Sequence, residues 1–361
     1  MSTLDVLVVG GGQAGLAIGY ELAQRGLRFV IVDAAPAIGQ VWRDRYDSLT
    51  LFTPAQYSNL PGMDFPASYD TYPTKDSVVT YLEQYTATFK LPIQLNTRVV
   101  EARQSGAGFE VETSAGAVQA RAVVAATGPF QRPFVPSFSA GIAPAVLQLH
   151  SSAYRNPNQL PPGAVLVVGA GNSGGQIAAE LAQTHDVTLA VGKRPPSFPQ
   201  RVLGRDIFWW LHGLGLMSVP VTSAIGRRMR RLDPLIGTEL GRLAREKGVR
   251  LVNRAVGAAD TTVQFAGGQA GSFSSIIWAT GFRPDYSWIK VLVLDQEGRP
   301  VHQRGVTVVP GFYFIGLPWL YRRGSALLGG VGSDAAFLAN RIAALVELSS
   351  ERLLAPAYGA R

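Results

Sequence analysis

The feature that most restricts the fold of this chain is a glycine-rich turn between an apolar strand and a helix. A buried-strand pattern at residues 6–9 runs directly into Gly10-Gly11-Gly12-Gln13-Ala14-Gly15. A helical pattern follows over residues 16–25, and a second apolar strand at residues 29–32 ends at Asp33. This alternation of strand, helix and strand predicts a β-α-β unit of the Rossmann type.

The spacing inside this turn has a chemical meaning. Gly10 allows the tight turn, Gly12 leaves room for a pyrophosphate to approach the backbone, and Gly15 lets the helix pack closely on the strand. Free N–H groups and the helix dipole favour an anion at the start of the helix. Asp33 follows the second strand, where a carboxylate accepts a hydrogen bond from a ribose 2′-hydroxyl. The unit is therefore predicted to bind a dinucleotide.

The same pattern recurs in the second half of the chain. An apolar strand at residues 165–168 leads into Gly169-Ala170-Gly171-Asn172-Ser173-Gly174, a helix extends to Leu181, and a strand at residues 187–191 closes the unit. The repetition predicts an α/β protein with two Rossmann-like dinucleotide-binding domains.

The two units differ after their second strand. The position that corresponds to Asp33 is Gly192, and Lys193 and Arg194 follow it. Loss of the carboxylate removes a repulsion of the 2′-phosphate of NADPH, and the two cations supply an attraction. We therefore expect the second site to prefer NADPH over NADH. The alternative is that Lys193 and Arg194 are solvated residues of a turn ahead of two prolines.

A shorter repeat marks the crossing points between the domains. Apolar strands at residues 122–126 and 276–279 both stop at a Thr-Gly turn, Thr127-Gly128 and Thr280-Gly281. Proline-rich stretches at residues 133–136 and 157–162 fit the connection into the second unit. We expect the first domain over residues 1–155, the second over residues 156–285, and a return segment over residues 286–361 that completes the first domain.

Length and composition agree with two domains. The chain has 361 residues, 47% of them hydrophobic, which is enough for a substantial core. No apolar run approaches the ~20 residues of a membrane-spanning helix. No basic segment precedes an apolar stretch at the N-terminus. We expect a soluble, cytoplasmic protein without integral membrane contact.

Cysteine is absent from the sequence, which excludes disulfides, thiolate metal sites and dithiol redox chemistry. We expect no metal site. The net charge of +8 includes one cluster, Arg227, Arg228, Arg230 and Arg231, which is typical of a solvated helix face. Since no nucleic-acid recognition motif accompanies the cluster, we expect no nucleic-acid partner, and the positive field is suited to phosphate-bearing cofactors.

Together the motifs resemble the flavin-containing monooxygenase superfamily, which also includes the Baeyer–Villiger enzymes. The resemblance covers nearly the whole chain. Besides the two glycine-rich turns, it is carried by Gly39-Gln40-Val41-Trp42-Arg43, residues 46–54, Ala126-Thr127-Gly128, Ala279-Thr280-Gly281-Phe282 and residues 311–332.

The resemblance implies two cofactors, with the NADPH-binding domain inserted into an FAD-binding domain. The positions that match the FAD site are Gly10, Gly12, Gln13, Ala14, Gly15, Asp33, Gln40, Trp42, Thr127 and Gly128. Those expected for NADPH are Gly169, Gly171, Asn172, Ser173, Gly174, Lys193 and Arg194. The segment at residues 39–43 is expected to lie along the flavin, and the family also implies a homodimer.

A reaction with dioxygen is implied as well. NADPH reduces the flavin, the reduced flavin and dioxygen form a C4a-hydroperoxide, and one oxygen atom passes to a small-molecule sulfide or amine or is inserted next to a ketone. Because the cofactor carries this chemistry, the protein needs no acid/base dyad.

Two positions depart from the family pattern. His150 keeps the histidine of the fingerprint Phe-x-Gly-x-x-x-His, but Pro144 and Val146 replace its first two residues. We consider His150 as either an interdomain hinge residue or a catalytic one. Phe52 stands where many members have an asparagine that hydrogen-bonds the oxygenated flavin, a bond that a phenyl ring cannot donate. We therefore expect partial uncoupling to hydrogen peroxide.

Substrate choice is assigned to residues 198–217, which contain Phe208, Trp209 and Trp210 beside Arg201 and Arg205. Alternatives for this segment are an ordinary aromatic core and a membrane surface. Two other functions stay open. One is an NADPH oxidase, or an NADPH-dependent reductase of a quinone or another acceptor, and the other is a flavin-bound sensor or partner protein that does not turn over. A dithiol reductase is excluded because it requires cysteines.

Overall fold

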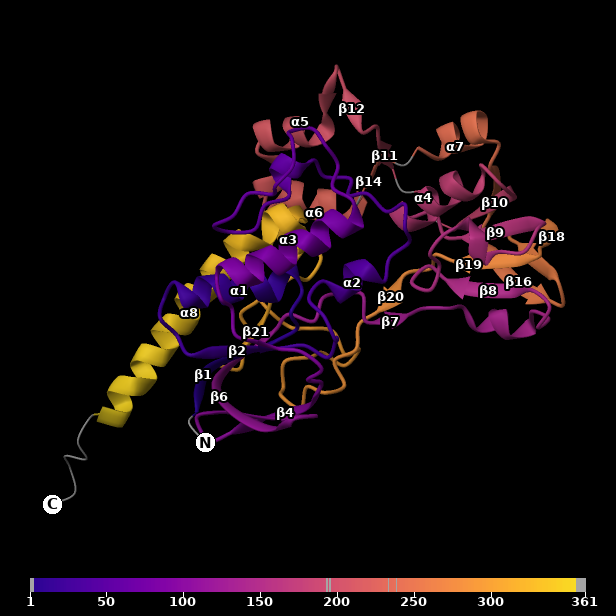
Figure 1. Cartoon of the computed structure of the whole chain (residues 1–361). Coiled ribbons are helices and arrows are strands. Elements are labelled where there is room, and N and C mark those ends of the chain that lie inside the picture. Colours follow the sequence, from indigo (N-terminus) through magenta and orange to yellow (C-terminus); the bar gives the residue numbers. More distant parts are fainter. Residues whose placement is uncertain (1–2, 193, 195, 233, 238, 355–361) are drawn as a thin grey trace.

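The computed structural model describes residues 3–192, 194, 196–232, 234–237 and 239–354. Figure 1 shows two lobes joined by a narrow connection. The first lobe holds the elements from both ends of the chain, and the second holds elements from its middle.

The first lobe is built on a seven-stranded sheet of order β3-β2-β1-β6-β5-β4, in which β21 also pairs with β6. Neighbours among β3, β2, β1, β6 and β21 are parallel, and β5 joins β6 and β4 antiparallel. The strands are β1 (Leu4–Val9), β2 (Phe29–Val32), β3 (Ile93–Gln94), β4 (Val99–Ser105), β5 (Gly108–Thr113), β6 (Gly116–Ala125) and β21 (Phe312–Phe314).

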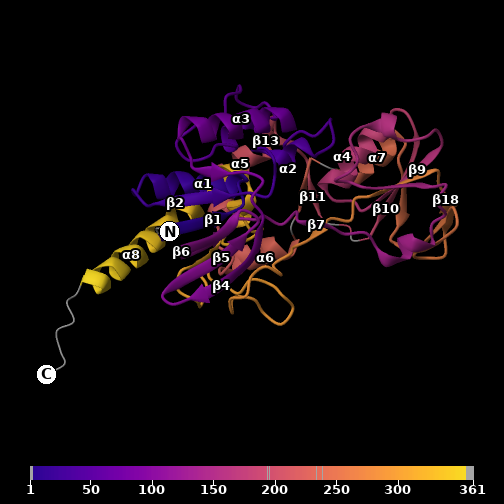
Figure 2. The same cartoon turned by 60° about the horizontal axis from the view of Figure 1, so that its bottom comes forward.

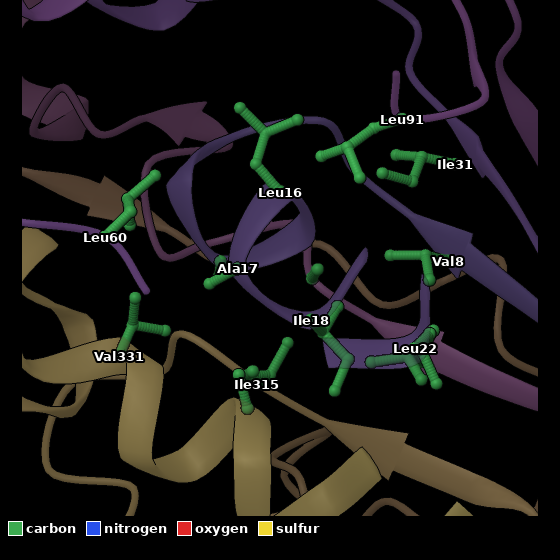
Figure 3. Close-up of a cluster of buried hydrophobic side chains, with 14 of the residues drawn as sticks. Val8, Leu16, Ala17, Ile18, Leu22, Ile31, Leu60, Leu91, Ile315 and Val331 are labelled. Carbon is green, nitrogen blue, oxygen red and sulfur yellow. The ribbon is translucent and has the colours of Figure 1, made fainter. Parts of the chain in front are cut away.

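Helices cover one face of this sheet, namely α1 (Gln13–Ala23), α3 (Lys75–Thr88) and α8 (Leu328–Leu354). Figure 3 shows Leu16, Ile18 and Leu22 of α1 gathered with Val8 of β1 and Ile315 next to α8, all fully buried. Because both faces of β1 are covered, its residues 6–9 form a continuous apolar run rather than an alternating one. The helix begins at Gln13, three residues before the predicted start, because extended Gly12 is its N-cap.

The second lobe contains a five-stranded parallel sheet of order β15-β10-β9-β19-β8. Its strands are β8 (Leu147–His150), β9 (Ala164–Val168), β10 (Asp186–Val191), β15 (Arg250–Asn253) and β19 (Ser275–Trp278). The helices α4 (Asn172–Leu181) and α7 (Leu240–Lys247) pack on it, and an antiparallel sheet of β16 (Ala255–Ala259), β17 (Thr262–Phe265) and β18 (Ala270–Ser272) lies beside it. Two Rossmann-type units are thus present, as predicted from the repeated turns.

The chain passes from the first sheet to the second, and later back to the first, directly after the two Thr-Gly turns. The crossing segments pair with each other as the antiparallel strands β7 (Arg132–Pro133) and β20 (Phe282–Arg283). The second sheet takes its strand β8 from residues ahead of position 156, where the sequence predicted that domain to start, because β8 pairs with β19. The exact limits of the domains stay a prediction.

The connection from β10 to β15 leaves the second sheet and packs on the first lobe (Figures 1 and 2). We call this part, the described residues of 196–237, the cap. It contains β11 (Ser197–Phe198), β12 (Arg201–Val202), β13 (Arg205–Asp206), α5 (Ile207–Gly213), η4 (Leu216–Ser218), α6 (Ala224–Leu232) and β14 (Leu235–Ile236). Tyr72 of the first lobe donates a hydrogen bond of 2.6 Å to the buried Asp206. The cap is therefore attached to the first lobe although it belongs in sequence to the second.

Two predictions about exposed segments can be compared with this arrangement. Arg227, Arg228, Arg230 and Arg231 are all exposed on α6, which confirms a solvated helix face. In α5, Phe208 is fully buried whereas Trp209 is exposed, so the aromatic run divides between core and surface. Among the helices of the described residues, none is long and apolar enough to cross a membrane.

Candidate functional site

A cavity of about 1080 Å³ lies at the carboxyl ends of β1, β2 and β6, where an open α/β sheet binds its ligands. All but one of the residues predicted to hold FAD line it. They are Gly10, Gly12, Gln13, Ala14, Asp33, Gln40, Trp42, Thr127 and Gly128. The exception is Gly15, which lies under the turn.

Gly10 and Gly15 explain how the first turn is held. Gly10 has φ +108°, and a Cβ there would lie 2.6 Å from the carbonyl oxygen of Ala126. A Cβ on Gly15 would lie 1.8 Å from the carbonyl oxygen of Gly10. Gly12 differs, because no atom lies within 4 Å of a Cβ placed on it. Two glycines thus allow close packing of the turn, and the third leaves its outer side open toward the cavity.

Asp33 supports the same turn. One carboxylate oxygen accepts a hydrogen bond of 2.5 Å from the N–H of Gly11, and the other accepts one of 2.7 Å from Ala35. Each oxygen keeps a second lone pair, and Asp33 lines the cavity. The carboxylate therefore orders the turn and stays available to a ribose hydroxyl.

The second turn repeats this geometry. Gly169 has φ +108°, and a Cβ on Gly174 would lie 1.8 Å from its carbonyl oxygen. Asn172, the first residue of α4, lines the same cavity as the first turn, and its buried Oδ1 has no hydrogen-bond partner among the described residues. Gly169, Gly171, Ser173, Gly174 and Arg194 do not line that cavity.

One of the two cations expected after β10 lies within the described residues. Arg194 is exposed, and Lys193 lies outside the described residues. Sequence reasoning missed Arg254, which directly follows β15 beside β10 and is also exposed. Its Cγ lies 3.7 Å from a Cβ placed on Gly192. No local pattern indicated Arg254, because only the pairing of β10 with β15 brings it to the end of β10.

His150 lies at the connection between the lobes and does not line the cavity. Its Nε2 donates to the carbonyl oxygen of Gly281 at 2.9 Å, so its Nδ1 accepts from Ser152 Oγ at 2.8 Å; the tautomer follows from these partners. Burial lowers the pKa of His150, and the charge of Arg45 adds to the effect. A neutral ring with both nitrogens engaged favours the hinge interpretation over the catalytic one.

Aromatic contacts hold the same connection. The ring of Phe282 packs edge-on against His150 at 4.9 Å and against Phe130 at 5.4 Å. The guanidinium of Arg45 lies 4.8 Å from the ring centroid of Phe130 and 5.2 Å from that of Phe282. Because Arg45 and Phe130 precede the second sheet and Phe282 follows it, these contacts fix the lobes at the crossing.

Phe52 lines the cavity, and its ring stacks on Phe208 of the cap at 6.0 Å. Its carbonyl oxygen accepts a hydrogen bond of 3.0 Å from Gln200 of the cap. The side chain therefore supplies an apolar wall and no polar hydrogen at this place.

The return segment contributes more of the lining than its sequence indicated. Gly316, Pro318, Trp319, Arg323 and residues 326–328 line the cavity. Gly316 has φ +75°, and a Cβ there would lie 2.6 Å from the Cβ of Ala14 in the first turn. The resemblance marked this tail, but no residue in it was predicted to bind a cofactor.

Two Rossmann-type sheets, whose glycine-rich turns both border one cavity, define a two-domain nucleotide-dependent oxidoreductase. Residues 7–202 match the pyridine nucleotide-disulphide oxidoreductase family. The chain is 49% identical to an oxidoreductase of Geobacillus kaustophilus named CzcO-like, over 94% of this chain and 98% of that one. It is 43% identical to the oxidoreductase CzcO of Bacillus subtilis, over 94% and 99%.

The solved structure of a relative indicates the type of reaction. The flavin-containing monooxygenase from Stenotrophomonas maltophilia is 32% identical, and the match covers 95% of this chain and 99% of that chain with a TM-score of 0.80. The chain therefore belongs to the pyridine nucleotide-disulphide oxidoreductase family and, within it, to the flavin-containing monooxygenase group that the sequence motifs resemble. Without cysteine it has no disulfide to reduce or oxidise.

Proposed function

We propose that this protein is an FAD- and NADPH-dependent monooxygenase that acts on a small molecule. The observation that carries the proposal is the shared cavity: residues 10–14 of the first turn and Asn172 of the second line it together. Two dinucleotides bound at these turns would direct their reactive rings into one space. An enzyme that passes a hydride from one to the other requires this arrangement.

The residues present fit both dinucleotides. Gly12 and Gly171 have no atom within 4 Å of an added Cβ, which leaves each turn a cradle for a pyrophosphate. Neither α1 nor α4 carries an acidic residue in its first turn, so neither helix repels an anion through a carboxylate of its own. The unpartnered Oδ1 of Asn172 offers an acceptor to a ligand between the two turns.

We assign the residues as follows. FAD is held by Gly10, Gly12, Gln13, Ala14, Asp33, Gln40, Trp42, Thr127 and Gly128, with Gly15 packing the turn. NADPH is held by Gly169, Gly171, Asn172, Ser173 and Gly174, and its 2′-phosphate by Lys193, Arg194 and Arg254. The protein is further proposed to be a cytoplasmic homodimer.

When bound, the flavin accepts the hydride of NADPH and activates dioxygen. The overall reaction is substrate + O₂ + NADPH + H⁺ → oxygenated substrate + H₂O + NADP⁺. The protein binds and orients both cofactors and excludes water from the reacting atoms. Leu51, Phe52 and Trp42 supply apolar walls for this purpose. His150 acts as a positioning residue, because its bond to Gly281 joins the second sheet to the crossing strand.

Oxygen incorporation is the decisive test. The FAD-loaded protein is supplied with NADPH, ¹⁸O₂ and a sulfide, an amine and a ketone in separate reactions. A monooxygenase incorporates one labelled atom into the product of at least one class. Stoichiometric peroxide with no label in any product would instead support the oxidase or reductase, which a quinone acceptor then tests. Failure of NADPH to bleach the flavin would support a sensor without turnover.

A further inference from the structure

A second, smaller cavity of about 60 Å³ lies beside the first. Thr53 and Leu327 line both, so the two spaces share a wall. The small cavity is formed by the cap, by Thr53 and Tyr57 of the first lobe, and by residues 322–330, which lead into α8. Phe208 and Met217 give it apolar sides, and no acidic residue of the described chain lines it.

Arg322 brings a charge to this space. Its Nη2 donates to the carbonyl oxygen of Gly330 at 3.2 Å and to the hydroxyl of Ser333. Its Nε is buried and has no hydrogen-bond partner among the described residues, and Arg322 takes part in none of the ion pairs found there. A buried cationic N–H without an acceptor costs free energy, and an acceptor bound in the cavity that Arg322 lines would offset this cost.

Further donors surround the same space. The ring of His212 stacks on Tyr57 at 4.4 Å with an interplanar angle of 12°. Burial lowers the pKa of His212, and the charge of Arg322 lowers it further, so the ring is neutral near pH 7 and keeps one N–H. The hydroxyl of Ser218 also borders the cavity. A cation, an imidazole and a hydroxyl thus converge between apolar walls.

We propose that the small cavity binds the carboxylate of an organic-acid substrate through Arg322. The volume admits a three-atom carboxylate or a few waters and excludes a ring or a nucleotide. The rest of the substrate extends past Thr53 and Leu327 into the larger cavity, where Phe52 and Trp42 lie. A planar guanidinium matches a carboxylate in shape and charge. This inference rests on the proposed monooxygenase function and names the class of its substrate.

The test compares an acid with its amide. (Phenylthio)acetate and (phenylthio)acetamide share a thioether and a phenyl ring and differ in charge. Their Kd values are measured by calorimetry on the FAD-loaded protein without NADPH, so that binding is independent of turnover. Because a hydrogen bond to a charged group is strong, we expect the acid to bind about 10- to 100-fold more tightly than the amide.

Variants locate the effect. In Arg322→Gln the preference for the acid is expected to fall to within about threefold, with FAD content unchanged, and Arg322→Lys is expected to keep part of it. Arg228→Gln is the matched control, because Arg228 is an exposed arginine of α6 in the cap and lines neither cavity. His212→Phe keeps a ring on Tyr57 and removes the N–H, and a several-fold weaker binding of the acid is expected.

Equal binding of the acid and the amide by the wild-type protein, or no measurable binding of the acid, would overturn the inference. So would an undiminished preference in Arg322→Gln. The comparison of acid and amide binding in the wild-type protein needs no variant. It therefore tests the carboxylate site even if the Arg322→Gln protein does not fold. Labelled oxygen in the sulfoxide is a separate readout, so failure of the monooxygenase function is recognised independently of carboxylate binding.

Discussion

Replacing Gly171 by alanine is expected to weaken NADPH binding while leaving the protein folded. Gly171 is the N-cap of α4, with φ −74° and ψ −177°, an extended backbone that alanine adopts. Beyond its chain neighbours and its own helix, no atom of the described residues lies within 4 Å of the added Cβ, so the methyl group meets no other part of the described chain. It enters instead the space in which the proposed pyrophosphate approaches the backbone.

The expected sizes follow from this geometry. Displacing an anion from one or two N–H donors loses about 1.5–3 kcal/mol for each charge-assisted hydrogen bond. The Kd for NADPH should therefore rise by about 10- to 100-fold or more. Alanine is a poorer N-cap than glycine, but it also lowers the entropy of the unfolded chain. These effects oppose each other, so the free energy of unfolding should change by less than about 1 kcal/mol and the Tm by no more than about 4 °C.

Gly174→Ala is the matched comparison within the same turn. Its Cβ would lie 1.8 Å from the carbonyl oxygen of Gly169, and ordinary contact begins at 3.4 Å, so the turn itself must move. Overpacking of this kind costs about 1–3 kcal/mol. The Tm of Gly174→Ala should fall by roughly 2–12 °C.

Stopped-flow reduction of the flavin at increasing NADPH concentrations provides the Kd and the limiting rate, and thermal unfolding provides the Tm. For Gly171→Ala we expect an unchanged limiting rate and unchanged FAD content. A wild-type Kd for NADPH in Gly171→Ala would refute the assignment of this turn to the pyrophosphate. A large fall in Tm would refute the steric reasoning instead.

Three further outcomes are expected. The wild-type protein should show a lower KM for NADPH than for NADH. Arg194→Ala and Arg254→Ala should each raise the KM for NADPH several-fold and leave the KM for NADH unchanged. Equal KM values for NADPH and NADH in the wild type would contradict the assignment of these arginines to the 2′-phosphate. Phe52→Asn should change the peroxide formed per NADPH consumed, since it places a donor on the cavity wall, and an identical yield counts against a role there. His150→Phe should lower the free energy of unfolding at pH 7 by about 1–3 kcal/mol through loss of the bond to Gly281. Because the folded pKa of His150 is lowered, the unfolded chain takes up the proton first as the pH falls below the ordinary value, so the difference between wild type and variant should narrow from pH 7 to pH 5 in denaturant titrations.

Local sequence was sufficient for the parts of the fold that local physics controls. A Cβ on Gly15 or Gly174 would collide with the carbonyl oxygen of Gly10 or Gly169, so the close contact between strand and helix requires glycine there. Because this glycine spacing is visible in the sequence, both β-α-β units were predictable from their turns. The Thr-Gly turns after β6 and β19 precede β7 and β20, which pair with each other. The observed start of α1 differs by three residues from the start predicted by its apolar pattern, because Gly12 is the N-cap and the helix begins at Gln13.

The position of the cap could not be predicted in the same way. Residues 198–217 follow the second nucleotide turn in the chain, yet Asp206 bonds to Tyr72 and Phe208 packs on Phe52, both of the first lobe. Contacts over such distances in sequence carry no local pattern, since a buried aromatic residue is equally apolar whichever partner it meets.

The sequence by itself therefore determined the two nucleotide units, the exclusion of dithiol chemistry by the absence of cysteine, and eleven of the positions that line the cavity. Only the tertiary structure decided that the two turns share one cavity, that Arg254 reaches the end of β10, and that Arg322 keeps a buried N–H without a partner beside His212. The reason is physical: spacing along the chain dictates the backbone of a turn, whereas burial and convergence of side chains depend on how distant elements pack.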